Sequence, residues 1–301
     1  MKKEIIPYIF HSISDLHQVL RLPKPLHPLI SLVDNTQIAV DKEELPVSFL
    51  LDFYKVSYKK GLRGKIRYGQ GYYDFDEGGL VFTSPHQLLA TTDDTEYKGY
   101  TLLIHPDFIR NYPLGKSIKN FGFFSYSANE SLHLSEKERD IVMSILKNIE
   151  QELTSTIDDF SQDVMIAQIE VLLNYSNRFY KRQFITRKAV NNDVVDKLDI
   201  LLNDYFDNEK KYGLPTVQHL AEQLNLSPRY LSDMLRSLTG QNAQQHIHNK
   251  LIEKAKELLS TKNLSVAEVA YQLGFEHPQS FNKIFKRKTT LSPLEFKHSF
   301  N

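Results

Sequence analysis

The sequence predicts an α+β protein of two domains, in which a small β-sandwich or barrel with two helices precedes an all-helical domain. Its 301 residues are enough for about two domains, each of roughly 100 to 200 residues and able to bury a core. Up to about Asn129, short runs of β-branched and aromatic residues alternate with clusters of Gly, Pro and Asp. After His133 the apolar residues recur at the spacing of a helix.

The composition is that of a globular protein in a reducing compartment. The chain is 41% apolar and 25% charged, which excludes extensive disorder. It has no cysteine, so disulfides, thiolate zinc sites and cysteine nucleophiles are excluded, and a cytoplasmic location is expected. No run approaches the roughly 18 apolar residues of a membrane span, and the first residues contain no apolar stretch of signal-peptide length. We therefore expect neither secretion nor a membrane partner.

Strand-forming segments dominate the first part of the chain. Residues with high strand propensity form four runs. Clusters of Gly, Pro and Asp flank these runs, and glycine-rich turns separate some of them. The runs lie at 28–33, 46–58, 79–83 and 100–105, and the glycine-rich turns lie at 69–71 and 77–79. Several short strands with such turns are typical of a small β-sandwich or barrel.

Two helices complete this domain. Ser135 and Glu138 have the spacing of a capping box, and Ile or Leu then recurs every four residues from Ile141 onward. A second helix with one apolar side follows. The two helices, at about 135–182, can either cover an open face of the sheet or pair with the helices of a second chain, and the sequence leaves both alternatives open.

The first domain is predicted to span residues 1–185, and the polar residues 186–193, which have no apolar period, are predicted to form a linker. From residue 194 to residue 301 every predicted element is a helix. The helices are predicted at 194–206, 216–224, 227–238, 243–259, 265–273 and 278–288, with a short last helix from Ser292. Residues 215–301 carry 11 basic and 7 acidic side chains, whereas residues 1–214 carry 26 and 30. A basic domain on an acidic chain favours a polyanionic partner.

Two segments of the helical domain match each other. Residues 219–236 correspond to residues 268–286, and Pro228 stands at the place of Pro278. Each copy has the parts of a helix-turn-helix, in which a small alanine lets the two helices cross closely. Proline at the first helical position sets the entry angle of the second helix. The side chains expected to anchor the second helices inward are Leu231, Leu235, Phe281 and Phe285.

The outward face of each second helix carries side chains that suit nucleic acid. The residues expected there are Arg229, Ser232, Asp233 and Arg236 in the first copy, and His277, Gln279, Asn282, Lys283 and Lys286 in the second. Arg and Lys suit guanine, Gln and Asn suit adenine, and the major groove admits one α-helix. The helix at 243–259 would be about 25 Å long, enough to hold the two second helices roughly one DNA turn apart. One chain is thus expected to enter two successive major grooves.

The helical domain resembles the DNA-binding domain of the AraC/XylS family of bacterial transcription regulators. The resemblance covers residues 214–300. It is carried by residues 220–221 and 226–232 in the first copy, 255–259 in the connecting helix, 265–275 and 281–286 in the second copy, and 291–296 at the end. The resemblance implies that the first domain is a cupin-like sensor or dimerisation domain.

The resemblance also implies partners. It implies a transcription regulator, here taken as an activator, that binds double-stranded DNA as a homodimer, responds to a small-molecule effector and contacts RNA polymerase. It implies no cofactor and no enzymatic activity.

Three positions depart from the family pattern. The connecting helix of the family usually carries an arginine near Lys250, so the phosphate or structural role implied there is not carried over. Thr290 stands where the family usually has a glycine that ends the helix in a left-handed conformation. Asp233 occupies a position that the resemblance implies faces bases. A carboxylate there can accept a hydrogen bond from cytosine but repels phosphate. The first copy is therefore expected to read less of the DNA than the second, or to read it differently.

A metal-dependent cupin enzyme is one alternative function. Such a site needs two closely spaced histidines, a carboxylate and a further histidine. Here His86 and His105 each stand alone, and His246 and His248 would point to different sides of a helix. We therefore expect no metal site.

A small-molecule-binding protein whose helical domain has no DNA role is the other alternative. Aromatic residues and one arginine could line the mouth of the barrel. These residues are Tyr54, Tyr58, Tyr68, Tyr72, Tyr73, Phe75, Phe82 and Arg67. The aromatic residues could equally form the core of a domain that only dimerises.

Overall fold

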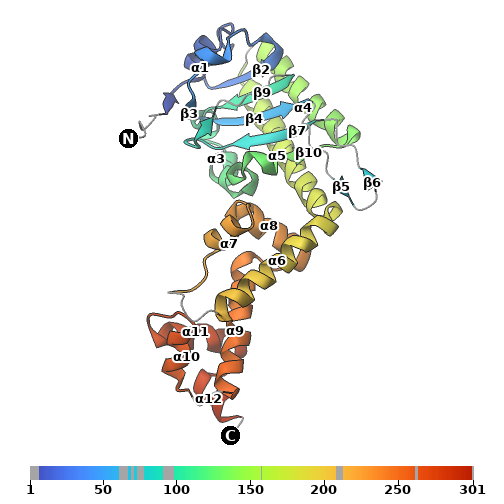
Figure 1. Cartoon of the computed structure of the whole chain (residues 1–301). Coiled ribbons are helices and arrows are strands. Elements are labelled where there is room, and N and C mark those ends of the chain that lie inside the picture. The colour runs from blue at the N-terminus through green and yellow to red at the C-terminus, as the bar shows by residue number, and fades with distance from the viewer. Residues whose placement is uncertain are drawn as a thin grey trace. The chain divides into compact units, whose positions relative to one another are not determined.

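The computed structural model of the chain divides into two compact units, Met1–Thr186 and Arg187–Asn301 (Figure 1). The structure describes residues 7–60, 67–68, 71–72, 78–90, 98–156, 158–207, 213–261 and 264–299. All strands within these residues belong to the first unit, and the described elements of the second unit are all helices. The predicted α+β class, with a β-rich part before a helical part, is confirmed.

The first unit is built around a five-stranded antiparallel sheet with the order β10-β7-β4-β9-β2. These strands are β2 (Ile30–Asp34), β4 (Tyr54–Lys59), β7 (Gly79–Thr83), β9 (Gly99–Ile104) and β10 (Leu132–His133). A second sheet has the order β1-β3-β8, and the strands are β1 (Tyr8–Phe10), β3 (Ser48–Leu51) and β8 (Leu89–Ala90). Strands β5 (Arg67–Tyr68) and β6 (Gly71–Tyr72) pair with each other. Each of the four predicted strand regions contains at least one strand.

The segment 46–58, predicted as one strand, is two strands in different sheets. Strand β3 pairs with β1, whereas β4 pairs with β7 and β9. The chain changes sheet at Asp52, whose backbone N–H donates to the Phe10 carbonyl at 3.0 Å, and at Phe53, whose side chain is fully buried. A continuous apolar run does not reveal such a break, because the residues on both sides of it are strand-forming.

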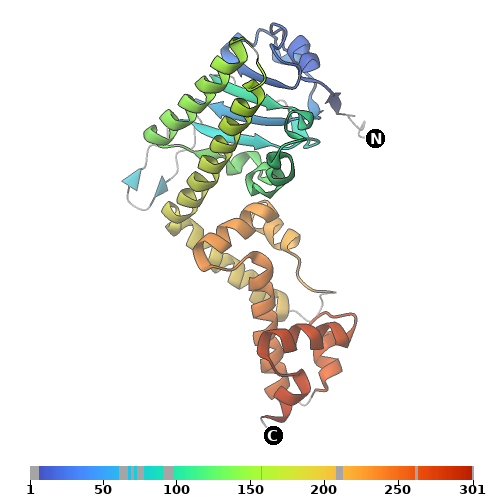
Figure 2. The same cartoon turned by 180° about the vertical axis from the view of Figure 1, so that it is seen from behind.

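Helices α4 (Glu136–Thr154) and α5 (Ser161–Thr186) lie side by side across one face of the five-stranded sheet (Figure 2). The predicted capping box starts α4, since Ser135 and Glu138 exchange hydrogen bonds of 3.0 and 3.4 Å. Of the two alternatives for this helix pair, covering the sheet is the one seen in the single chain. The remaining helices of this unit are α1 (Ile13–Val19), α2 (Pro106–Ile109) and α3 (Pro113–Ser117), with 3-10 turns at Asn35–Gln37, Lys42–Glu44, Ile118–Asn120, Gly122–Ser125 and Ala128–Glu130.

The residues predicted as a linker are largely helical. Helix α5 continues to Thr186, and α6 (Lys188–Asp207) begins two residues later. Gln183, a polar residue near the end of α5, is only 1% exposed. Its amide accepts from the His133 N–H at 2.8 Å and donates to the Ser131 carbonyl at 3.2 Å, so it completes the hydrogen bonding beside β10. A buried amide that is satisfied in this way cannot be told from a solvated one by its residue type.

Seven helices form the described part of the second unit. They are α6, α7 (Val217–Gln223), α8 (Pro228–Thr239), α9 (Ala243–Thr261), α10 (Val266–Gln272), α11 (Pro278–Thr289) and α12 (Pro293–His298). Helix α9 contacts α8 and α6 as well as α10, α11 and α12 (Figure 1). The pairs α7–α8 and α10–α11 therefore share one long helix as their support. The predicted helices are confirmed to within a few residues, except that α6 begins at Lys188 rather than at residue 194.

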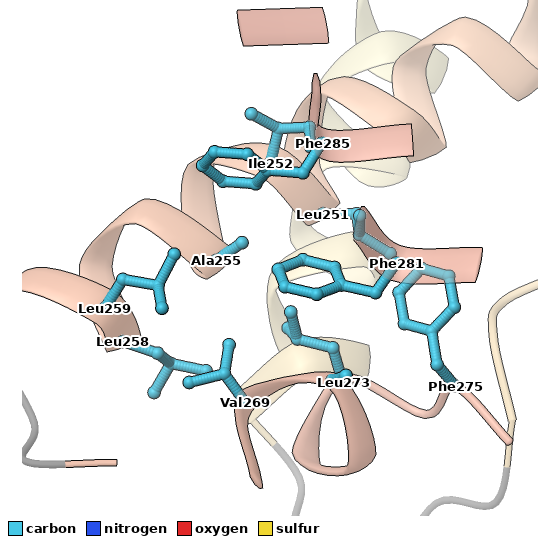
Figure 3. Close-up of a cluster of buried hydrophobic side chains, with 11 residues drawn as sticks. Leu251, Ile252, Ala255, Leu258, Leu259, Val269, Leu273, Phe275, Phe281 and Phe285 are labelled. Atoms are coloured by element: carbon cyan, nitrogen blue, oxygen red, sulfur yellow. The ribbon is translucent and has the colours of Figure 1, made fainter. Parts of the chain in front are cut away.

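The inward side chains of α11 enter a core that α9 and α10 complete (Figure 3). Phe281 and Phe285 are fully buried, and Figure 3 shows Phe281 beside Leu251 of α9 and Leu273, the C-cap residue of α10. The first pair uses the same device, because Leu231 and the neighbouring apolar positions of α8 are also fully buried. The inward anchors predicted for both second helices are confirmed.

The two second helices end in the same way. The hydroxyls of Thr239 and Thr289 donate to the carbonyls four residues earlier, at 2.8 and 2.9 Å. The next residue is left-handed in both, with φ 76° at Gly240 and φ 69° at Thr290. Thr290 therefore adopts the conformation that a glycine would adopt there and accepts the strain of a β-branched residue in it.

Replacing Thr290 by glycine is expected to raise the free energy of unfolding of the second unit by about 1 kcal/mol, because the left-handed conformation costs a residue with a Cβ roughly 1–2 kcal/mol. Chemical denaturation followed by far-UV circular dichroism measures the change. Gly240→Thr is the matched control, since a Cβ at Gly240 meets no atom within 4 Å and only backbone strain is added. It should lower the stability by a similar amount, and a shift of both variants in the same direction would contradict the assignment.

Candidate nucleic-acid interface

One face of α11 is exposed. Phe281 and Phe285 hold the opposite face in the core, so helical geometry turns Asn282, Lys283 and Lys286 outward. All five residues predicted for this face are exposed: His277, Gln279, Asn282, Lys283 and Lys286. His277 is the N-cap residue, and its side chain makes no capping hydrogen bond. The arrangement presents amide and ammonium groups together on one rigid surface.

Arg287 joins this face, although the sequence-based selection omitted it. It follows Lys283 by four residues, so the two side chains lie on the same side of α11, and both are exposed. The spacing alone could have identified it. Helix α11 carries four basic side chains, Lys283, Lys286, Arg287 and Lys288, and no acidic one. The face is therefore strongly positive.

The corresponding face of α8 carries less positive charge, because an aspartate of the same helix pairs with one of its arginines. Arg229 and Arg236 are exposed, and Ser232 is half-buried. The Arg229 guanidinium donates through Nε to Asp233 Oδ2 at 3.0 Å, with the side chains 47% and 20% exposed. Asp233, which was predicted to face bases, thus pairs with a cation of its own helix. The spacing of four residues between opposite charges is the signal for such a pair.

The outward faces of α8 and α11 differ in charge at matched positions of the two copies. In the matching segments Lys283 stands at the place of Asp233, and Gln279 at the place of Arg229. Helix α8 carries two basic side chains and one acidic one, against four and none in α11. Helix α11 is therefore the stronger anion-binding surface. Helix α9, whose 19 residues span about 28 Å, separates the two along the chain.

His246 and His248 of α9 contact different partners. His246 Nε2 lies 2.9 Å from the Thr239 hydroxyl, and His248 Nε2 lies 3.0 Å from the Gln244 amide nitrogen. Burial lowers the pKa of His246, and the Asp199 carboxylate opposes that shift. Burial also lowers the pKa of His248, and here the charges of α11 act in the same direction. No group of three His, Asp or Glu side chains within the described residues could hold a metal ion.

In the first unit, the predicted mouth residues with described side chains lie under helices instead. Tyr58 and Phe82 are buried, and Tyr54 packs on Phe124 with 5.1 Å between ring centroids. Of the two alternatives for the aromatic residues, the core is the one seen for these three, because strand alternation turns them to the helix-covered face. Tyr73 and Phe75, and the side chains of Arg67, Tyr68 and Tyr72, lie outside the described residues.

The opposite face of the sheet is polar where β4 pairs with β9. The hydroxyls of Ser57 and Thr101 lie 3.1 Å apart, and the Thr101 hydroxyl donates to Asn35 Oδ1 at 2.8 Å. Lys55 shares this face, since it precedes Ser57 by two residues. Within the part of the chain that the structure describes, its ammonium group makes no hydrogen bond or ion pair. Burial, and then the charge of Lys59, lower the pKa of Lys55 to about 8.

Raising the pH from 7 to 9 is expected to stabilise the first unit by about 1 kcal/mol. A lysine with a lowered pKa in the folded state destabilises that state while it is charged, and this cost declines as the pH rises through about 8. Lys55→Met should be more stable than the native chain at pH 7 and should lose this pH dependence. Thermal denaturation at both pH values measures it, with Lys116→Met, at an exposed position of α3, as the control that keeps the dependence. An unchanged pH dependence in Lys55→Met would refute this assignment.

No helix among the described residues is both long enough and apolar enough to cross a membrane.

Comparison with known proteins identifies the second unit. A family model described as a helix-turn-helix domain matches residues 220–299. The HTH-type transcriptional activator RhaS of Salmonella paratyphi B is 30% identical over 138 residues, which are 46% of this chain and 45% of that protein. The chain thus aligns with about half the length of the curated relatives that it matches.

Two solved structures are similar to about a third of the chain. The C-terminal domain of the two-component response regulator yesN from Fusobacterium nucleatum is 30% identical, with 35% of this chain and 98% of that chain covered and a TM-score of 0.31. The DNA-binding domain of the global transcriptional factor AdpA, solved in complex with a target DNA, is 28% identical, with 36% and 91% covered and a TM-score of 0.30.

Proposed function

We propose that this chain, which belongs to the AraC/XylS family through its helix-turn-helix domain, is a cytoplasmic transcription regulator. In this proposal it binds double-stranded DNA in a sequence-specific way. The family and the relatives indicate a transcription regulator rather than an enzyme. The observation that carries the proposal is the outward face of α11. It combines exposed Gln279 and Asn282 with Lys283 and Lys286, opposite the two phenylalanines that anchor the helix.

We further propose that each chain uses both second helices. Helix α9 supports α8 and α11 from one rigid element, so the two can enter successive major grooves, whose centres lie about 34 Å apart. Lysine and arginine contacts with phosphates supply most of the affinity, and Gln279, Asn282 and Lys283 supply most of the selectivity. The Arg229–Asp233 ion pair makes α8 the weaker contributor.

For the first unit we propose a cupin-like domain that pairs two chains, senses a small molecule, or does both. Val164 and Val171 of α5 are 42% and 41% exposed, which suits contact with a second copy. A hollow of about 510 Å³ between the sheet and α4 has the size of a small-molecule site. Its lining combines apolar residues such as Leu32 and Met143 with polar and charged ones, Asp140, Ser144, Lys147 and Glu150. Binding of an effector would raise the melting temperature of the full chain in a ligand screen. A screen of sugars, aromatic acids and fatty acids without any shift favours the purely dimerising domain.

Activation is carried over from the Salmonella relative, which is named a transcriptional activator. Activation in turn implies contact with RNA polymerase. Transcription from a promoter with a bound site, measured with and without the protein, tests this part of the proposal separately from DNA binding. Repression at every such promoter would contradict it.

Lys283→Ala and Lys286→Ala are expected to weaken DNA binding in different ways. Lys283→Ala should relax the base preference at one position and cost roughly 1–3 kcal/mol of binding free energy, because a side chain that reads a base edge is lost. Lys286→Ala should weaken binding to all sequences about equally, because a phosphate contact is lost. Fluorescence anisotropy on a selected duplex and on a random duplex measures both effects. Lys197→Ala, on exposed α6, is the control, and equal losses on both duplexes for both variants would contradict the roles.

Selection of genomic fragments by the purified full chain tests the proposed function as a whole. The expected result is an enriched motif with two boxes whose centres lie about 10 base pairs apart, repeated if the protein is a dimer. Recovery of fragments without any shared motif would refute sequence-specific binding.

A further inference from the structure

A group of basic side chains extends the outward face of α11 toward the end of that helix. It consists of His248 on α9 and of Arg287 and Lys288 at the end of α11. The Lys288 ammonium donates to Asn249 Oδ1 at 3.1 Å, which ties the end of α11 to α9 next to His248. The Gln244 amide nitrogen donates to His248 Nε2 at 3.0 Å and orients the imidazole ring. Two helices thus bring three nitrogen-bearing side chains together.

This group has no counter-charge among the residues that the structure describes. By contrast, two lysines of α9 are paired: Lys250 with Glu253 at 3.5 Å, and Lys254 with Asp207 at 2.8 Å. Arg287 and Lys288 form no ion pair with a described carboxylate. Cations gathered without an acid repel one another, and an anion placed between them removes that repulsion.

We propose that His248, Arg287 and Lys288 form a phosphate clamp that holds one phosphodiester of the DNA backbone beside the groove occupied by α11. The proposal rests on the proposed function, since it needs α11 to bind DNA. Arg287 lies on the same side of α11 as Lys283. When Lys283 enters a major groove, the phosphate backbone that borders the groove therefore comes close to Arg287. His248 lies on the supporting helix α9, next to the end of α11 that carries Arg287 and Lys288.

The charges around His248 predict that binding takes up a proton. In the free protein its pKa is lowered first by burial and then by Arg287 and Lys288. The acidic groups of the neighbouring helix α6 act elsewhere, Asp199 on His246 and Asp207 on Lys254. A bound phosphate offsets the two cations and raises the pKa of His248. The complex is therefore favoured at low pH, and the gain is lost as the pH rises through the pKa of the bound state.

The pH dependence of DNA binding by the full chain tests the clamp. Anisotropy of a labelled duplex at constant ionic strength, from pH 8 down to pH 5.5, is expected to show tightening of roughly tenfold for each unit by which phosphate raises the pKa. His248→Gln should remove most of this dependence. His246→Gln, two residues away with a carboxylate neighbour, should retain it. A His248→Gln variant with the native pH dependence overturns the proposal.

The salt dependence gives a second readout. Arg287→Gln and Lys288→Gln should each lower the slope of log affinity against log salt by up to about 0.9, whereas Lys197→Gln should leave it unchanged. Native slopes in both variants overturn the clamp while leaving the proposed function standing. Failure of the native chain to bind any duplex refutes the proposed function instead. As a further control, inorganic phosphate without DNA should leave the melting temperature of the full chain unchanged. A rise in melting temperature that His248→Gln abolishes would assign the site to free phosphate and overturn the proposal.

Discussion

Phe281→Ala is expected to lower the free energy of unfolding of the second unit by about 3–5 kcal/mol and to abolish sequence-specific DNA binding. The side chain is fully buried, with its ring centroid 5.5 Å from that of Phe275 and 5.6 Å from that of Phe285. Its removal leaves a cavity between α9, α10 and α11 (Figure 3). Because α11 is held against α9 mainly by Phe281 and Phe285, the loss of the Phe281 ring also removes the fixed orientation of the outward face of α11.

Urea denaturation of the full chain, followed by far-UV circular dichroism, measures this loss, and anisotropy on a selected duplex measures the binding. Phe281→Leu should cost less, because most of the volume is kept. Tyr271→Ala on α10, where the native side chain is 59% exposed, is the control that should change stability little. A loss below about 1 kcal/mol for Phe281→Ala, with native binding, would show that α11 is not positioned by this core.

Gly274→Ala is expected to destabilise the second unit by roughly 2–5 kcal/mol, through strain and overlap together. Gly274 lies at the start of the turn between α10 and α11 with φ 91°, where a residue with a Cβ is strained. A Cβ at this position would lie 2.1 Å from the carbonyl oxygen of Gly213 and 2.6 Å from its carbonyl carbon. Either the turn or the segment that leads into α7 would have to move, so the two helix pairs would lose their fixed relation.

The matched position in the first pair provides the control. Asn225 occupies the corresponding turn with φ 55°, and asparagine tolerates this conformation better than most residues. Asn225→Gly should be neutral or slightly stabilising, and Asn225→Ala should cost no more than about 1–2 kcal/mol. Thermal denaturation of the three variants separates strain from overlap. If Gly274→Ala proves no more destabilising than Asn225→Ala, the close approach to Gly213 does not contribute.

The helical half of the fold could be predicted because its signals are local. Ser227 caps α8, with its hydroxyl accepting from the Tyr230 N–H at 3.3 Å, and Pro228 occupies the first helical position. Ser265 and Glu268 exchange capping hydrogen bonds of 2.7 and 3.2 Å at the start of α10. Such contacts span three residues, so the sequence order itself shows them. The outward face of α11 follows from the same periodicity.

Other features depend on residues far apart in the chain and could not be predicted. The break between β3 and β4 is fixed by Phe10, and the burial of Gln183 is fixed by β10. The sequence left open whether Tyr54 lines a mouth or lies in the core, because the pattern shows alternation but not which face the helices cover. The pairing of Asp233 with Arg229 could have been inferred from their spacing, whereas the approach of His248 to the end of α11 required the packed structure.

Hydroxyl-radical footprinting of a selected DNA site tests most directly whether both second helices grip the duplex. The native chain should protect two blocks whose centres lie about 10 base pairs apart. Lys283→Ala should weaken protection in one block, and Arg236→Ala should weaken it in the other. A single protected block, or two variants that weaken the same block, would contradict an account in which α8 and α11 occupy successive major grooves.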